Sequence, residues 1–254
     1  MNFRQWMLCA MLSAGALSPV QARDADDVVI FSTAVKVDVD AAGEAVGFES
    51  SAELSPALRD LVETRARELQ FRPAMVDGQA RGGVTYAMFT VCAVPEGDRM
   101  LVAAEFGGNG PVLADGAISP APPRYPVEAL KRGLSADLIV HYEVQADGGA
   151  VFESLEYAEG TRAQGRRLFE AMAQDWVAGM RYTPEQVGGE AVATRISMPV
   201  SFEVMRGGRR EAQRMLERNR QEWLERPECQ AAQQAQGGGH MVSAESPFVI
   251  RDAG

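Results

Sequence analysis

Alternation of hydrophobic and polar residues predicts two β-hairpins of similar design. The strand, turn and strand are 35–39, 41–43 and 45–51 in the first hairpin, and 138–144, 147–149 and 151–157 in the second. A two-residue period is typical of a strand with one buried face. Each turn contains glycine, which reaches the positive φ values that tight hairpin turns require.

A helical period follows each hairpin. Ser55 and Pro56 are typical of the N-cap and first position of a helix. The apolar stripes are Leu58, Leu61, Val62, Ala66 and Leu69 in the first helix, and Leu168, Phe169, Met172, Trp176 and Val177 in the second. A further alternating strand comes next in both halves. Each half is therefore predicted to be β-β-α-β, an α+β fold in which a helix packs on one face of a short antiparallel sheet.

An internal repeat supports this division. Residues 71–80 resemble residues 182–191, since an aromatic residue, Pro, Val, Gly and Ala recur at a constant spacing of 111. Such self-similarity indicates tandem structural units. The predicted organisation is a signal peptide (1–22), a divergent first domain (23–95), a linker rich in Gly and Pro (96–122), a second domain (123–206), a C-terminal helix (209–228) and a flexible tail (229–254).

The N-terminus carries the pattern of a signal peptide. An apolar segment of about 15 residues follows Arg4, which is shorter than the roughly 20 residues that span a bilayer. It ends at Val20-Gln21-Ala22, where Val20 and Ala22 occupy the positions read by signal peptidase. We therefore expect cleavage after Ala22 and a periplasmic protein. The alternative is an uncleaved segment that anchors the chain in the inner membrane.

Export also favours disulfide formation between the cysteines that remain. Cys92 and Cys229 are the two that remain after cleavage, in a compartment where disulfides persist. We predict that they form one intramolecular disulfide, with two buried free thiols as the alternative.

Composition argues against several kinds of function. The formal net charge is −10, which disfavours binding to nucleic acid or anionic lipid. His141 and His240 are the two histidines; the first lies on a strand and the second follows three glycines. Neither belongs to a cluster with metal-ligand spacing. We expect no catalytic residue, no metal, no cofactor and no small-molecule substrate.

The second half resembles the TonB C-terminal domain family. The resemblance lies in Pro123-Arg124-Tyr125-Pro126, the turn Asp147-Gly148, Tyr182-Thr183-Pro184 and Met198-Pro199-Val200-Ser201-Phe202, in that order. It implies the fold and a non-catalytic binding role linked to outer-membrane transport. The implied partners are a protein or an extended peptide, such as a segment of an outer-membrane receptor. Two departures are Ala136, where the family often has Gly, and the lack of a long Pro-rich spacer after the N-terminal segment.

The last strand of the second half is the predicted binding edge. Proline in a sheet is largely confined to edge strands, and Pro199 lies within this strand. The resemblance points to the same strand. The candidate binding residues are Ile196, Ser197, Met198, Pro199, Val200, Ser201, Phe202, Glu203 and Val204. A competing arrangement pairs this strand with residues 86–93 of the first half, which would close both edges.

Three functional hypotheses remain open. The first is a periplasmic binding module, the second is an energy transducer that keeps its N-terminal anchor, and the third is a structural exported protein without a peptide ligand. The apolar segment Phe248-Val249-Ile250 receives no role, and the oligomeric state stays open.

Overall fold

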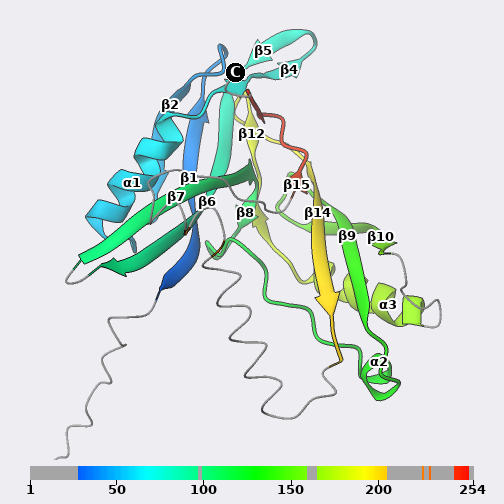
Figure 1. Ribbon diagram of the computed structural model, residues 1–254. Coiled ribbons are helices and arrows are strands. Elements are labelled where there is room, and N and C mark those ends of the chain that lie inside the picture. The colour runs from blue at the N-terminus through cyan, green and yellow to red at the C-terminus, as the bar shows by residue number, and fades with distance from the viewer. Residues whose placement is uncertain are drawn as a thin grey trace, which may run out of the picture.

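The computed structural model describes residues 28–96, 99–158, 165–204, 225, 229 and 243–251. Within these ranges the protein is a mixed α/β structure with two larger antiparallel sheets and few helices (Figure 1). The predicted signal peptide and almost all of the predicted C-terminal helix lie outside them. In the part of the chain that is described, no helix is long and apolar enough to cross a bilayer.

The first sheet has the strand order β13-β12-β6-β1-β2, and β7 also pairs with β6. Its strands are β1 (Val29–Val39), β2 (Ala45–Ser50), β6 (Gly83–Glu96), β7 (Arg99–Gly110), β12 (Gln186–Val187) and β13 (Glu190–Ala191). Helix α1 (Pro56–Arg67) covers one face, and Ser55 caps its first turn by accepting the Leu58 N–H. Val62 and Ala66 of α1 are buried in the core of this sheet, as the stripe predicts.

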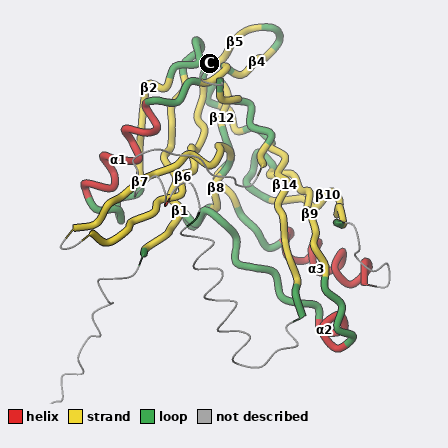
Figure 2. The backbone as a smooth tube through the Cα atoms, viewed as in Figure 1, coloured by secondary structure: helices red, strands yellow, loops and turns green. Residues whose placement is uncertain are grey.

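The second sheet has the order β10-β9-β14-β15. Its elements are β9 (Ala136–Val144), β10 (Ala150–Tyr157), β14 (Thr194–Phe202) and β15 (Ser243–Ala244), with α2 (Val127–Lys131) and α3 (Arg166–Ala178) beside them. Phe169, Ala173 and Val177 of α3 are buried against the sheet. Both predicted hairpins are confirmed, as β1–β2 and β9–β10. Figure 2 shows the two sheets with the helices in red.

Short strand pairs complete the described structure. They are β3 (Phe71–Arg72) with β16 (Val249–Ile250), β4 (Ala74–Val76) with β5 (Gln79–Arg81), and β8 (Val112–Leu113) with β11 (Tyr182–Thr183).

The repeated segments occupy equivalent places in the two halves. The Phe71 N–H donates to the Gly43 carbonyl in the first hairpin turn (3.0 Å), and the Tyr182 N–H donates to the Gly148 carbonyl in the second (2.8 Å). Both turn glycines have positive φ. Each repeated segment then forms a small hairpin, β4–β5 in the first half and β12–β13 in the second.

The structure departs from the predicted organisation in the linker. Residues 96–122 include β7 and β8 rather than a simple connector. Val102 and Phe106 pack against the first core, and Ala104 is buried in it. The sequence indicates at most a short strand at 100–104 within this linker, and β7 is longer because it continues through the glycines up to Gly110.

The halves also share a sheet, which the predicted domain division did not include. Strand β12 comes from the second half, yet it pairs with β6 at Val84 and Gly83. The tail is likewise not a free extension, since residues 243–251 contain β15 and β16.

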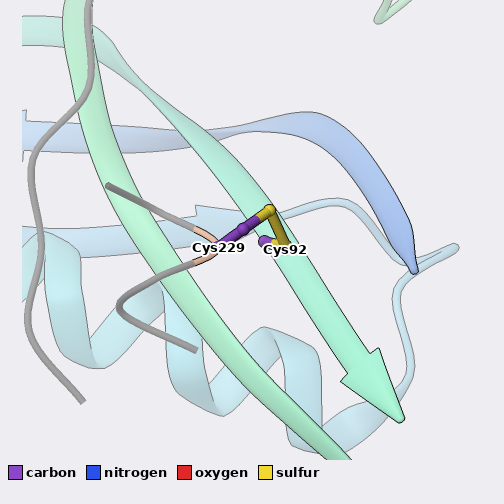
Figure 3. Close-up of a disulfide and its surroundings, with 2 residues drawn as sticks. All are labelled: Cys92 and Cys229. Atoms are coloured by element: carbon purple, nitrogen blue, oxygen red, sulfur yellow. A yellow bond between two sulfur atoms is a disulfide. The ribbon is translucent and has the colours of Figure 1, made fainter. Parts of the chain in front are cut away.

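The disulfide between Cys92 and Cys229 is present (Figure 3). Cys92 lies on β6, and both residues are fully buried. Because Val91 faces the core under α1, Cys92 points to the opposite face of the first sheet. The bond ties residue 229 to that face across a sequence separation of 137 residues.

Candidate functional site: the outer edge of β14

Strand β14 is paired unequally on its two sides. Strand β9 pairs with it from Thr194 to Phe202. On the outer side, β15 pairs only with Ile196 and Ser197, and the Glu245 N–H donates to the Arg195 carbonyl at 2.9 Å. The start of β14 is therefore covered and cannot act as an edge. No described residue pairs with its outer side beyond Ser197.

The competing arrangement, in which the first half closes this edge, does not occur. Strand β6 pairs with β1, β7 and β12, and β14 is not among its partners. The edge of β6 that corresponds to the outer edge of β14 is instead occupied by β7, from Tyr86 to Glu96.

The pairing shows which backbone groups of β14 point outward. Backbone groups of alternate residues face opposite sides of a strand. The Arg195 carbonyl accepts a bond from outside, so Ser197, Pro199 and Ser201 also direct their backbone groups outward. The missing N–H of Pro199 consequently costs no bond to β9. The open groups are the Pro199 carbonyl and the N–H and carbonyl of Ser201.

The same alternation explains why Val204 is not part of this edge. Its N–H donates to the Ser135 hydroxyl at 3.2 Å, on the side of β9. Val204 was among the predicted binding residues, because the sequence could not assign the direction of each N–H. The structure places the open stretch at Pro199 and Ser201.

The side chains of β14 give the edge one apolar and one polar face. Ile196 and Phe202 are buried, whereas Met198 and Val200 are only half-buried. Both half-buried side chains pack on the core beneath α3 and keep part of their surface exposed. An added strand would cover their exposed parts, and covering apolar area is favourable.

An aromatic cluster supports the far end of the strand. The Phe202 ring lies 5.1 Å from Tyr125 and 5.2 Å from Phe169, between ring centroids. The Tyr125 hydroxyl donates to the Leu134 carbonyl at 2.6 Å. Tyr125 and Pro126 thus lead into the short helix α2.

On the polar face, the hydroxyl of Ser197, the imidazole of His141 and the carboxylate of Glu156 lie in a row. Ser197 Oγ lies 2.9 Å from His141 Nδ1, and His141 Nε2 lies 3.6 Å from Glu156 Oε2. The Glu156 side chain is 68% exposed, so its position is weakly fixed. Ser197 is paired with strands on both sides, so its own N–H is unavailable to a developing oxyanion. The arrangement does not favour nucleophilic catalysis.

Arg195 lines the same small pocket as His141 and Ser197. Its Nε lies 3.1 Å from Glu153 and 3.8 Å from Glu143. The hydrogen bond that Arg195 donates to Glu153, together with the surrounding carboxylates, raises the pKa of the Arg195 guanidinium, which stays charged. Across the residues that the structure describes, no three His, Cys, Asp or Glu side chains come together as metal ligands.

A groove of about 870 Å³ lies beside α3, and the sequence did not indicate it. The extended residues 120–126 form one wall, and Met172 and Trp176 of α3 contribute to the other. Trp176 was predicted as a core residue, but it is half-buried and its Nε1 donates to the Ala121 carbonyl at 2.9 Å. This bond holds the proline-rich segment against α3.

Residues 121–204 match the family model described as Gram-negative bacterial TonB protein C-terminal. The matched range begins before α2 and ends after β14, so it contains the second sheet without β15.

Two relatives each match about a third of the chain. Protein TonB of Vibrio cholerae serotype O1 is 32% identical over 82 residues, which is 32% of this chain and 32% of the relative. Protein TonB of Xanthomonas campestris pv. campestris is 30% identical over 81 residues, which is 32% of this chain and 34% of the relative. The match therefore spans about a third of the length of these relatives.

Proposed function

We propose that this protein is an exported, periplasmic binding module of the TonB C-terminal type, which takes an extended segment of a partner protein as an added strand on β14. The observation that carries the proposal is the set of outward backbone groups of Pro199 and Ser201, which pair with no described residue. An exposed row of such groups is a template for a further strand. The half-buried Met198 and Val200 beside it would add apolar contact.

The partner class follows from the similarity to TonB proteins. TonB couples energy to transport and is not an enzyme, so the proposal is a protein partner linked to outer-membrane transport. Segments of outer-membrane receptors are the first candidates. The acidic chain, with a formal charge of −10, fits such a partner better than nucleic acid or an anionic membrane.

The first half is proposed to be a divergent copy that supports the second. The equivalent hydrogen bonds of Phe71 to Gly43 and of Tyr182 to Gly148 favour duplication. Because β7 occupies the edge of β6, an added strand has no place at the equivalent position. The binding role is therefore assigned to the second half alone.

Two alternative functions, an energy transducer and a structural protein without a peptide ligand, can be distinguished from the proposed one by experiment. An energy transducer would keep residues 1–22 as an anchor, whereas we expect the mature chain to begin at Arg23. The intact mass of the protein from cells distinguishes these cases. A structural protein without a peptide ligand would show no binding that depends on the β14 edge.

The test compares Ser201→Pro with Ser201→Ala. Proline removes the outward N–H without touching the bonds to β9, while both variants lose the Ser201 hydroxyl bond to Asp137. The probe is an array of overlapping peptides from the periplasmic segments of outer-membrane receptors. We expect S201P to bind about tenfold or more weakly than S201A. Equal binding by the two folded variants would reject the proposed edge.

A further inference from the structure

The C-terminal segment 243–251 joins the two sheets. In Figure 1 it is the red segment that starts beside β14 and runs to the first sheet. Strand β15 pairs with β14, and β16 pairs with β3 across Ile250 and Phe71. The Arg251 N–H donates to the Gln70 carbonyl at 2.8 Å. We refer to residues 243–251 as the strap.

The middle of the strap is firmly anchored. Phe248 is fully buried in the core of the first sheet. Asn109 Nδ2 donates to the Phe248 carbonyl and to the Ser246 hydroxyl, both at 2.8 Å. The Ser246 hydroxyl donates in turn to the buried Glu185 carboxyl at 2.5 Å. These contacts hold the strap where it leaves β14.

The first part of the strap lies on the proposed binding edge. Ala244 packs against the core of the second sheet beside Ile196. By the alternation established above, the outward groups of Ser197 face Ser243, so they are already used. Strand β15 begins at Ser243, opposite Ser197, so an incoming strand along Pro199 meets β15 there.

We propose that the strap is a built-in stop on the β14 edge, which confines a partner strand to Pro199 and Ser201 and fixes its register. This inference rests on the proposed function of that edge. Register is weakly specified where one strand can slide along another. A fixed neighbour such as β15 removes that freedom. The stop also sets the length of partner segment that can pair.

Two variants are designed to detach β15 from β14, each in a different way. Glu245→Pro removes the N–H that donates to the Arg195 carbonyl, and Glu245→Ala is its matched control. Gly110→Ala acts from β7, because a Cβ at Gly110 would lie 2.8 Å from the Ala244 Cβ. The second variant leaves the sequence of the strap unchanged.

The experiment measures amide hydrogen exchange and peptide binding in the full mature chain. We expect the Ser197 amide to be protected in the wild type and E245A, and to exchange at least tenfold faster in E245P and G110A. With the receptor-peptide array as probe, the released variants should bind longer peptides about tenfold more tightly, since two backbone hydrogen bonds become available. Their exchange footprint should extend from Ser201 back to Ser197.

Two results would overturn the stop. One is a Ser197 amide that exchanges as fast as Ser201 in the free wild type, which would mean that β15 does not cover it. The other is an exchange footprint that remains confined to Ser201 after Ser197 has been released. Peptide binding that is equal in S201P and S201A contradicts the proposed function instead, and the two failures are thereby distinguished.

Discussion

The Thr85 hydroxyl donates to the Glu185 carboxyl at 2.6 Å, although the two residues are 100 positions apart in the sequence. Thr85 belongs to β6 of the first sheet, and Glu185 directly precedes β12 of the second half. Thr194 of β14 donates to the same carboxyl at 2.9 Å, and Ser246 of the strap completes the group. A fully buried carboxyl thus connects both halves and the strap to one point.

This carboxyl should make stability depend on pH. Burial raises the pKa of Glu185 above its ordinary value, and the three hydroxyl donors act in the opposite direction. The folded state therefore holds the proton more tightly than the unfolded state. The stability that this provides is full below the unfolded pKa and is lost as the pH rises through the folded pKa.

Glu185→Gln should remove that dependence. Glutamine stays neutral, so the variant should gain free energy of unfolding relative to the wild type as the pH rises above about 4.5, by up to roughly 1.4 kcal/mol per pH unit. Urea unfolding at several pH values measures this difference. Parallel pH profiles for the two proteins would show that Glu185 titrates alike in the folded and unfolded states.

The strap should contribute substantially to the stability of the first core. Phe248→Ala should lower the free energy of unfolding by about 3–5 kcal/mol, because Phe248 is fully buried. Val249→Ala is the matched control, since Val249 is 53% exposed and should change stability by about 0.5 kcal/mol or less. Chemical denaturation of both variants gives the comparison. Similar small losses would indicate that the strap is not anchored at Phe248.

The disulfide should stabilise the protein by restricting the unfolded chain. Cys92 and Cys229 close a loop with a sequence separation of 137 residues, for which reduction should cost about 2–5 kcal/mol. Unfolding with and without a reductant measures this loss. The double variant Cys92→Ala, Cys229→Ala is the control and should not respond to reductant. Two free thiols in the unreduced protein would contradict the pairing.

The local structure was predictable where the pattern of side chains was regular. The hairpins around Gly43 and Gly148 and the cap at Ser55 follow from spacing and turn chemistry alone. The pairing of β12 with β6 was not predictable, because two-residue strands carry no periodic signal. Phe248 had an apolar signal but no visible partner, since the core that it enters is built from distant residues.

The candidate site was predictable only as a strand. Pro199 and the family resemblance pointed to β14, but neither could show that β15 covers Ile196 and Ser197. The direction of each N–H depends on the register with β9 and β15, which the sequence does not specify. The open stretch could therefore be placed only once both pairings were known.

The most direct test of the account is amide hydrogen exchange at Ser201, with and without a bound receptor peptide. The Ser201 N–H points to the open edge, so it should exchange nearly unprotected in the free protein and slow at least tenfold in the complex. The amides of Val200 and Phe202 point toward β9 and should be protected in both states. A Ser201 exchange rate that does not change when the peptide is bound would contradict strand addition at β14.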